Sequence, residues 1–317
     1  MITLNPLYRF VDALEMELAF GDDTEITYGD ALSLVEEEQK GLDDYNCGAS
    51  DASAKVDTLE TLISDAFTHL QNRQALFGNS YPFQMDKSSR TSKYVRVEKM
   101  SNAQTLYAFL LACSHLSRYD KKIQIELTNV FEDVCVPVAA NYMAGEASRF
   151  GAAGRKRCKT FAPKLKDAIT ELAEHLNGAI IPVNINEIAN KNTGDCGIDI
   201  VVRKPFPGNN KLFGMLTALG QCTCSELDWK RKVHQSLYGN KVSQYFYLKH
   251  DAVNLFFVPF FWQDLFGKWD NEAELSSCIP FDRLRICQLM TDEDTKDLAG
   301  FMKKCLEKQP KLVGYSA

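Results

Sequence analysis

The sequence predicts an α/β protein of the α+β type, in which a mainly helical N-terminal region precedes a domain built on a mixed β-sheet. In the first half of the chain, apolar residues recur at steps of three and four, the period of amphipathic helices. From about residue 179, short β-branched runs alternate with turn-forming residues, as in strands. We therefore expect a helical region over 1–120 and a sheet-containing domain over 121–317. A boundary near Gly151 would fit the same change in composition.

Four helices are expected before the first strand of the second region. Apolar positions between residues 56 and 70 share one helix face, and 106–116 is apolar nearly all round, as in a buried helix. A third helix covers 122–143, where Pro137 should kink or split it. A fourth runs over 163–176.

The strands follow in a compact order. Segment 179–183 comes directly after a helix C-cap signal, and 198–203 and 214–223 are β-branched or apolar runs. Ser225 is expected to cap a helix that continues to residue 238. This part of the chain therefore predicts the order helix, strand, strand, strand, helix.

The C-terminal part predicts one further strand, a second strand-like stretch and a last helix. An apolar strand covers 254–261, where Pro259 favours a sheet edge or a bulge. Residues 281–286 alternate like a strand and lead into a final helix over 291–309.

Composition narrows the function classes. Of the 317 residues, 45% are hydrophobic and 25% charged, which is typical of a globular protein. No apolar run reaches the length of about 20 residues that spans a bilayer, and no secretory signal is visible. Ten scattered cysteines then indicate reduced thiols, and the expected location is the cytoplasm. Cys222 and Cys224 lack a second ligand pair at zinc spacing.

The net charge of −6 leaves room for a local nucleic-acid surface. The densest basic run contains Arg155, Lys156 and Arg157, which are candidate phosphate-binding residues. The alternative is a solvated helix face. Arg283 and Arg285 could also contact phosphate, although a solvated strand edge explains them equally simply.

Two strand ends carry the candidate chemistry. Asp199 lies in the run Thr-Gly-Asp-Cys-Gly-Ile-Asp, and Gln221 follows it by 22 residues, a spacing that fits two strands joined by a turn. Acceptors on neighbouring strands lie about 5 Å apart, close enough to share a cation. Mg²⁺ needs few protein oxygens because it keeps several waters. Asp195, in the same run, is better explained as a turn residue, and Glu146 and Glu187 are competing acidic candidates.

The motif Thr-Gly-Asp-x-Gly-Ile-Asp followed by Gly-Gln-Cys resembles the half-motifs of the PD-(D/E)xK, or restriction-endonuclease-like, nuclease superfamily. The resemblance is nearest to the branch of Holliday-junction resolvases and endonucleases that restrict modified DNA. It implies a restriction-endonuclease-like core in which Asp199 is the principal metal ligand and Gln221 the second. Cys222 would supply a backbone carbonyl. Phe131-Glu132 resembles the upstream helix element of that branch, which implies a catalytic role for Glu132.

The chain departs from the family pattern at one position. Thr223 stands where the family has a lysine, and threonine carries no positive charge. The following helix offers Lys230 and Lys232 instead, and a long lysine stem can bring an ammonium group to the site from there. We expect Lys232 to take the catalytic role and Lys230 to contact nucleic acid.

The sequence therefore predicts a Mg²⁺- or Mn²⁺-dependent endodeoxyribonuclease. The resemblance implies DNA as the substrate, a role in prokaryotic restriction or anti-phage defence, and a partner defence protein such as an ATPase. No membrane association is expected, and a homodimer would suit cleavage of both strands. Two alternatives remain open at this point: a catalytically inactive nuclease-fold subunit that binds nucleic acid or a partner protein, and a helical protein-binding protein with an accidental motif.

Overall fold

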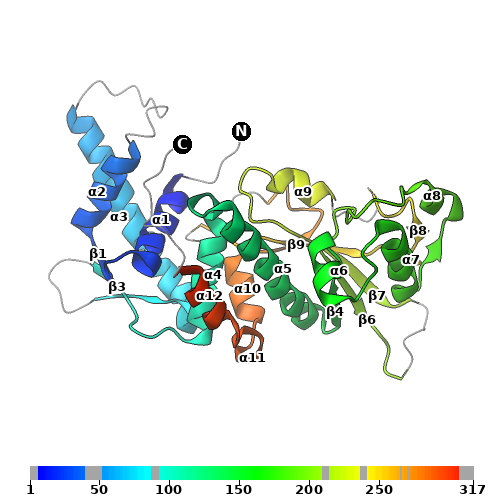
Figure 1. The fold of residues 1–317 in the computed structure, drawn as a ribbon. Helices are drawn as coiled ribbons and strands as arrows, with labels where there is room; N and C mark the ends of the chain where they lie inside the picture. The colour runs from blue at the N-terminus through cyan, green and yellow to red at the C-terminus, as the bar shows by residue number, and fades with distance from the viewer. Residues whose placement is uncertain are drawn as a thin grey trace. The chain divides into compact units, whose positions relative to one another are not determined.

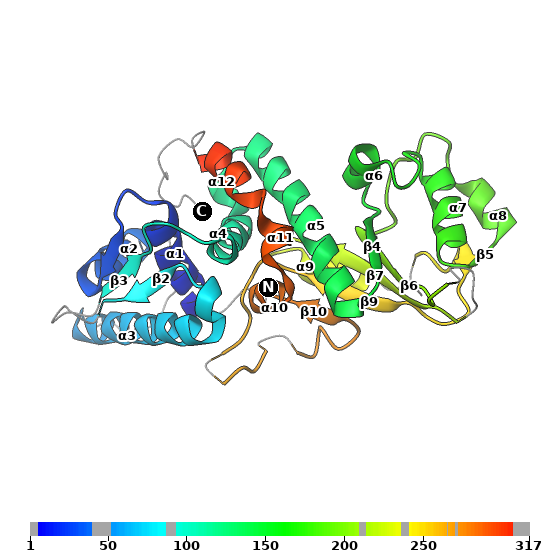
Figure 2. The same cartoon turned by 90° about the horizontal axis from the view of Figure 1, so that it is seen from below.

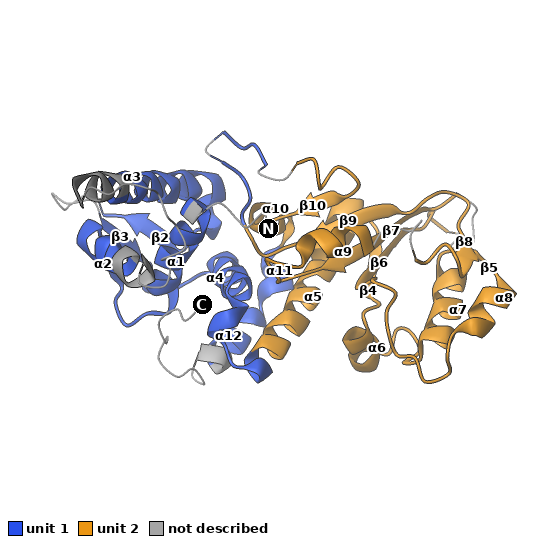
Figure 3. Ribbon diagram, turned by 90° about the horizontal axis from the view of Figure 1, so that it is seen from above, with its two compact units in different colours: residues 1–123, 261–269, 291–317 blue, residues 124–260, 270–290 orange. Residues whose placement is uncertain are grey.

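The computed structural model describes residues 6–39, 52–86, 93–208, 214–235, 241–264, 266–269 and 272–306. The protein is a mixed α/β chain that divides into two compact units (Figures 1 and 3). Unit 1 comprises residues 1–123, 261–269 and 291–317, and unit 2 comprises 124–260 and 270–290. Unit 2 thus starts close to the expected boundary at residue 120, but the last segment groups with unit 1, which the predicted domain 121–317 did not anticipate.

Unit 1 packs helices around a small antiparallel sheet (Figure 2). The sheet has the strand order β1-β3-β2. Its strands are β1 (Glu25–Thr27), β2 (Phe83–Met85) and β3 (Lys93–Arg96). Its helices are α1 (Pro6–Phe20), α2 (Tyr28–Gln39), α3 (Ala52–Phe77), α4 (Asn102–Ser114), α11 (Asp292–Thr295) and α12 (Leu298–Leu306), with 3₁₀ turns at Gly78–Ser80 and Leu116–Arg118.

Helix α4 forms the centre of unit 1. A capping box between Ser101 and Gln104 starts the helix, and every residue from 105 to 113 is buried. This confirms the buried helix that the uniformly apolar sequence predicts. Helix α12 packs on α4, where the rings of Phe109 and Phe301 lie 6.0 Å apart.

A buried charge network ties α1 to α3 and α4. The Arg73 guanidinium contacts Asp12 Oδ1 at 2.5 Å and Glu15 Oε2 at 2.8 Å. The hydroxyl groups of Tyr81 and Tyr107 both donate to the Glu15 carboxylate, each at 2.7 Å. The charges of this network are therefore paired and hydrogen-bonded, as burial requires.

Unit 2 is built on a mixed five-stranded sheet with the order β10-β9-β7-β6-β4. Its strands are β4 (Glu146–Arg149), β6 (Ile200–Lys204), β7 (Leu216–Cys222), β9 (Val253–Phe257) and β10 (Ile279–Phe281). The pairs β4/β6 and β6/β7 are antiparallel, whereas β7/β9 and β9/β10 are parallel. In the antiparallel hairpin, Ile200 lies opposite Gly220. This register places Asp199 beside Gln221.

The helices of unit 2 frame this sheet. They are α5 (Lys121–Met143, which enters unit 2 at residue 124), α6 (Ala152–Cys158), α7 (Leu165–His175), α8 (Pro182–Glu187), α9 (Trp229–Gln235) and α10 (Arg283–Leu289). Helix α9 lies in the crossover from β7 to the parallel strand β9. Helix α7 buries its apolar face in a cluster that includes Val201 of β6 and Leu219 of β7. The sheet hairpin that carries Asp199 and Gln221 is therefore anchored in a core.

Several expected elements differ from the structure. Segment 179–183 is not a strand of the main sheet: only β5 (Ala179–Ile180) is extended, and it pairs with β8 (Phe246–Tyr247). Pro182 instead starts helix α8 because its fixed φ suits the first helical position. Strand β6 lies between β7 and β4. The sequence did not predict β4.

Two further expectations need correction. Helix α5 runs through Pro137 as one helix, so the expectation that this proline splits it is wrong, whereas the kink expected as the alternative stays a prediction. Residues after 281 form helix α10 and not a strand, because the Asp282 side chain caps it by accepting from the Arg285 backbone N–H. The predicted ends at 238 and 309 lie outside the described residues.

Candidate metal-binding site

The candidate site lies where three strands of the unit 2 sheet meet at Asp199. This residue directly precedes β6, and its backbone N–H donates to the Gly220 carbonyl at 2.8 Å. Its own carbonyl accepts from the N–H groups of Phe150 (2.7 Å) and Gly151 (3.1 Å), which follow β4. The backbone of Asp199 is thus fixed from both neighbouring strands.

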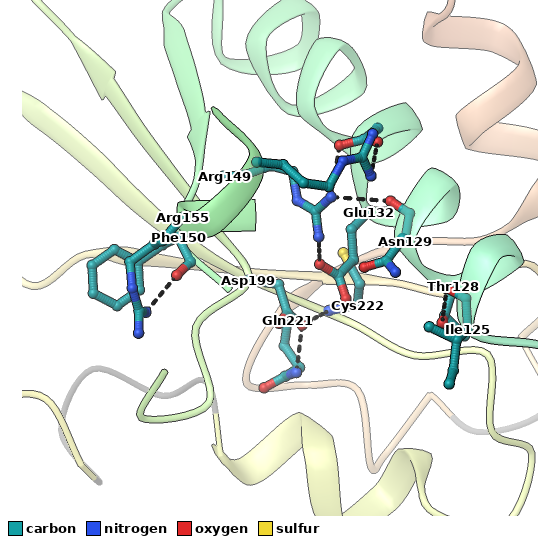
Figure 4. A network of polar contacts seen from close by, with 12 residues as sticks. Ile125, Thr128, Asn129, Glu132, Arg149, Phe150, Arg155, Asp199, Gln221 and Cys222 are labelled. Carbon is teal, nitrogen blue, oxygen red and sulfur yellow. Dashed lines mark hydrogen bonds and ion pairs between the residues drawn. The ribbon is translucent and has the colours of Figure 1, made fainter. Parts of the chain in front are cut away.

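The Asp199 carboxylate is buried and hydrogen-bonded to β7 (Figure 4). Its Oδ2 atom accepts from Gln221 Nε2 at 2.6 Å and from the Cys222 backbone N–H at 2.8 Å. The structure therefore places the two residues singled out by the strand spacing on antiparallel neighbours, with converging side chains. Side chains on opposite faces of the sheet would have excluded a shared site.

A tight turn at residues 195–198 directly precedes Asp199. Asp195 Oδ1 accepts from the Gly197 N–H at 2.9 Å, and the Asp195 carbonyl accepts from the Ile198 N–H at 3.1 Å. Gly197 has φ = +79°, a conformation that favours glycine, and a Cβ there would lie 3.3 Å from Gln221 Oε1. Asp195 is accordingly a turn residue, as expected.

Glu132 approaches the same point from helix α5. Its Oε2 atom forms an ion pair with Arg149 Nη2. The other terminal nitrogen of Arg149 contacts Asp133 Oδ1 at 2.7 Å and the Asn129 carbonyl at 3.1 Å. Arg149 is buried, and the sequence analysis missed it because its partners lie 16 to 20 residues upstream on α5.

Gly151 separates the two carboxylates. A Cβ atom at this position would lie 3.1 Å from Asp199 Oδ1 and 3.2 Å from Glu132 Oε2. The oxygens of both acids therefore border one small space that no side chain of residue 151 fills.

The electrostatics of this space disfavour two ionised acids on their own. Burial, reinforced by the charge of Glu132, raises the pKa of Asp199 to about 8, while the Cys222 N–H and Lys232 act in the opposite direction. Burial also raises the pKa of Glu132, although Arg149 counteracts it. A cation between the carboxylates would oppose both shifts, because it stabilises the ionised form of each acid.

Lys232 stands beside the site, whereas Lys230 does not. Lys232 Nζ lies 3.5 Å from the Cys222 carbonyl oxygen. Lys230 pairs with Glu274 Oε1 at 2.6 Å and lies over the Trp229 ring. Thr223 at the end of β7 is buried, and its hydroxyl accepts from the Ser225 N–H at 3.1 Å.

The basic run on α6 is not a uniform surface, and the nucleic-acid role expected for Arg155 is corrected. Only 1% of Arg155 is exposed, and its guanidinium donates to the carbonyls of Phe150, Thr193 and Gly194. The Arg155 guanidinium therefore satisfies backbone acceptors and fixes the loop that leads to Asp199. Lys156 and Arg157 are exposed, and Arg157 also contacts Asp133 Oδ2 at 2.8 Å.

The remaining acidic candidates are placed elsewhere. Glu146 forms an exposed ion pair with Arg203 at 2.8 Å, and Glu187 is the last residue of α8. Arg285 donates to the Pro280 carbonyl at 2.7 Å, and Arg283 is completely buried.

The donors at Asp199 suit a hard divalent cation. The atoms available for coordination are all oxygens, the ligand type that Mg²⁺ prefers. They come from the carboxylates of Asp199 and Glu132, the Cys222 carbonyl and the Gln221 side-chain amide. Gln221 Oε1 is buried and has no hydrogen-bond partner among the described residues. Across all the residues that the structure describes, no group of three or more His, Cys, Asp or Glu side chains is arranged to hold a metal. A cation here would thus depend on the amide and backbone oxygens, which fits the small ligand set of Mg²⁺.

No protein-family model, curated protein or solved structure matches the chain. Within the ranges that the structure describes, none of the helices combines the length and the apolar character needed to cross a bilayer.

Proposed function

We propose that the chain is a Mg²⁺-dependent nuclease that hydrolyses phosphodiester bonds in DNA through a restriction-endonuclease-like core in unit 2. The observation that carries the proposal is the 2.6 Å hydrogen bond between Gln221 Nε2 and Asp199 Oδ2 on antiparallel neighbours. The surrounding order of α5, β4, β6, β7, α9 and β9, with β9 parallel to β7, supports the same core.

Each residue of the site has a role under this proposal. Asp199 is the principal cation ligand, and Glu132, Gln221 and the Cys222 carbonyl supply further oxygens. For Gln221 Oε1 to face the same cation as Asp199, the amide would have to rotate and release the present hydrogen bond from Nε2. When bound, Mg²⁺ would polarise the scissile phosphate and lower the pKa of a bound water.

Lys232 takes the place of the missing strand lysine. Its ammonium group already lies next to the Cys222 carbonyl, and its charge already acts on the Asp199 carboxylate. From that position it can stabilise negative charge that develops on a phosphate during hydrolysis. The displacement of lysine from Thr223 to α9 thus leaves the chemistry possible.

DNA binding would use the exposed cations near the site. Lys156 and Arg157 on α6 are exposed, and Arg231 on α9 is 61% exposed. Phosphate contacts of this kind position a duplex without reading its sequence. The role in restriction or anti-phage defence, with an ATPase-like partner or as a homodimer, is proposed from the resemblance alone.

The test compares plasmid cleavage by the full chain and an Asp199→Asn variant. Supercoiled plasmid is incubated with Mg²⁺ or Mn²⁺, with EDTA as the metal-free control. We expect nicking or linearisation by wild type and loss of cleavage in Asp199→Asn. The matched control Asp167→Asn alters an exposed acid on α7 and should cleave as wild type does.

Equal behaviour of wild type and Asp199→Asn with both metals would refute the nuclease proposal. The second candidate function is a catalytically inactive nuclease-fold subunit that binds nucleic acid or a partner protein. The observation that favours it is the buried, uncharged Thr223. It predicts salt-dependent DNA binding in a gel-shift assay without cleavage under any of these conditions.

A further inference from the structure

Gly151 occupies a position where the backbone does not require glycine. It caps α6 with φ = −46° and ψ = 147°, which any L-residue can adopt. Its N–H donates to the Asp199 carbonyl at 3.1 Å, a bond that a larger residue would also form. The absence of a side chain instead leaves open a space beside its Cα atom.

That space is bordered by the two acids of the candidate site. The nearest atoms to a Cβ at 151 would be Asp199 Oδ1 at 3.1 Å and Glu132 Oε2 at 3.2 Å, followed by the Asp199 Cα atom at 3.6 Å. Both oxygen distances are tighter than ordinary van der Waals contact. A methyl group would thus press on both carboxylates, which are its nearest neighbours among the described residues other than Phe150 and Ala152.

The Glu132 carboxylate can pair with Arg149 or with a cation bound beside Gly151. In the present arrangement its Oε2 atom is bound to Arg149. The same oxygen already borders the space beside Gly151, 3.2 Å from the position of a Cβ atom there, so a cation in that space would contact it together with Asp199. A methyl group there would hold Glu132 on Arg149 and exclude water and ions from the gap.

We infer that Gly151 is a positioning residue that keeps open the space in which Asp199 and Glu132 share one divalent cation. The inference rests on the proposed function, since it assigns the cation position within that site. It makes the missing side chain at residue 151 a determinant of cation affinity.

The experiment measures Mn²⁺ binding to the full chain without nucleic acid, by calorimetry and by electron paramagnetic resonance of the free ion. We expect Gly151→Ala to weaken binding at least tenfold. Gly300→Ala in α12 is the matched control because a Cβ there meets nothing within 4 Å, and it should bind as wild type does. Circular dichroism checks that each variant is folded.

A double-mutant cycle separates steric exclusion from general damage. Glu132→Asp shortens the acid by one methylene group and withdraws its oxygen from the methyl group. The loss caused by Gly151→Ala should therefore be smaller in the Glu132→Asp background than in wild type. An equal loss in both backgrounds would overturn the assignment.

The remaining outcomes are also decisive. Wild-type affinity in folded Gly151→Ala overturns the inference and leaves the nuclease proposal intact, because Asp199→Asn tests that proposal independently. An unfolded Gly151→Ala also overturns it, since the inference requires the methyl group to disturb only the two carboxylates. Absence of Mn²⁺ binding by wild type removes both the inference and the metal-dependent proposal.

Discussion

Asp199 should destabilise the metal-free protein as the pH rises. Its folded-state pKa of about 8 stands far above the ordinary value of 3.8 because the carboxyl is buried near Glu132. The folded state therefore keeps a proton that the unfolded chain releases above pH 4. The associated stability is complete below about pH 4 and is lost progressively as the pH rises toward 8.

Asp199→Asn removes this loss because an amide stays neutral and is nearly the same size. One pKa unit corresponds to about 1.4 kcal/mol, so between pH 5 and pH 7 the free energy of unfolding should shift in favour of the variant by about 3 kcal/mol at most. The Asn Oδ1 atom can still accept from the Cys222 N–H. The substitution that abolishes the proposed activity should thus stabilise the metal-free fold.

Urea unfolding in EDTA at several pH values between 5 and 8 measures this difference. Hydrogen–deuterium exchange of peptides from β6 and β7 assigns the transition to unit 2, because a chain of two units need not unfold in one step. Excess Mn²⁺ should stabilise wild type and not the variant. A stability difference that does not change with pH would refute the electrostatic reasoning.

Three further predictions concern the basic residues. Lys232→Met should slow plasmid cleavage about 100-fold, the scale of a lost charge-stabilising donor, whereas Lys230→Met on the same helix should change it less than threefold; equal effects would contradict the assignment. Thr223→Lys should restore at least part of the cleavage in the Lys232→Met background, because it returns an ammonium group to the strand that carries Gln221; no recovery would show that position 223 cannot serve the site. Arg155→Met should lower the free energy of unfolding by about 3 kcal/mol, because it leaves three carbonyls unpaired. The salt dependence of DNA binding should stay unchanged in Arg155→Met and become weaker in Lys156→Ala.

The pairing of Asp199 with Gln221 was predictable because it follows from local rules. The alternation of the two strands sets which side chains share a face, and the turn-rich connection sets their register. The position of Lys232 was predictable only as one of two choices, since the phase of a seven-residue helix is decided by what it packs on.

Strand β4 was not predictable because its sequence, Glu-Ala-Ser-Arg, has little strand preference of its own. It is extended because it pairs with β6, and Glu146 lies opposite Arg203, 57 residues along the chain. Tertiary pairing of this kind overrides local propensity.

Arg155 was misassigned for a similar reason. Within the run Arg155–Arg157 nothing local distinguishes the buried cation from the exposed ones. Its carbonyl partners at Thr193 and Gly194 lie 38 and 39 residues away, so only the fold separates the three side chains.

The split composition of unit 1 bears on how the chain is made. A ribosome delivers residues in order, and the strands of unit 2 are all synthesised by residue 281, before helix α12 of unit 1 begins at Leu298. The surface of α4 that Phe301 covers, next to Phe109, must therefore stay uncovered while the whole of unit 2 emerges. Such a waiting apolar surface is a site for chaperone binding or aggregation. A fragment that stops before α11 would keep that surface uncovered permanently.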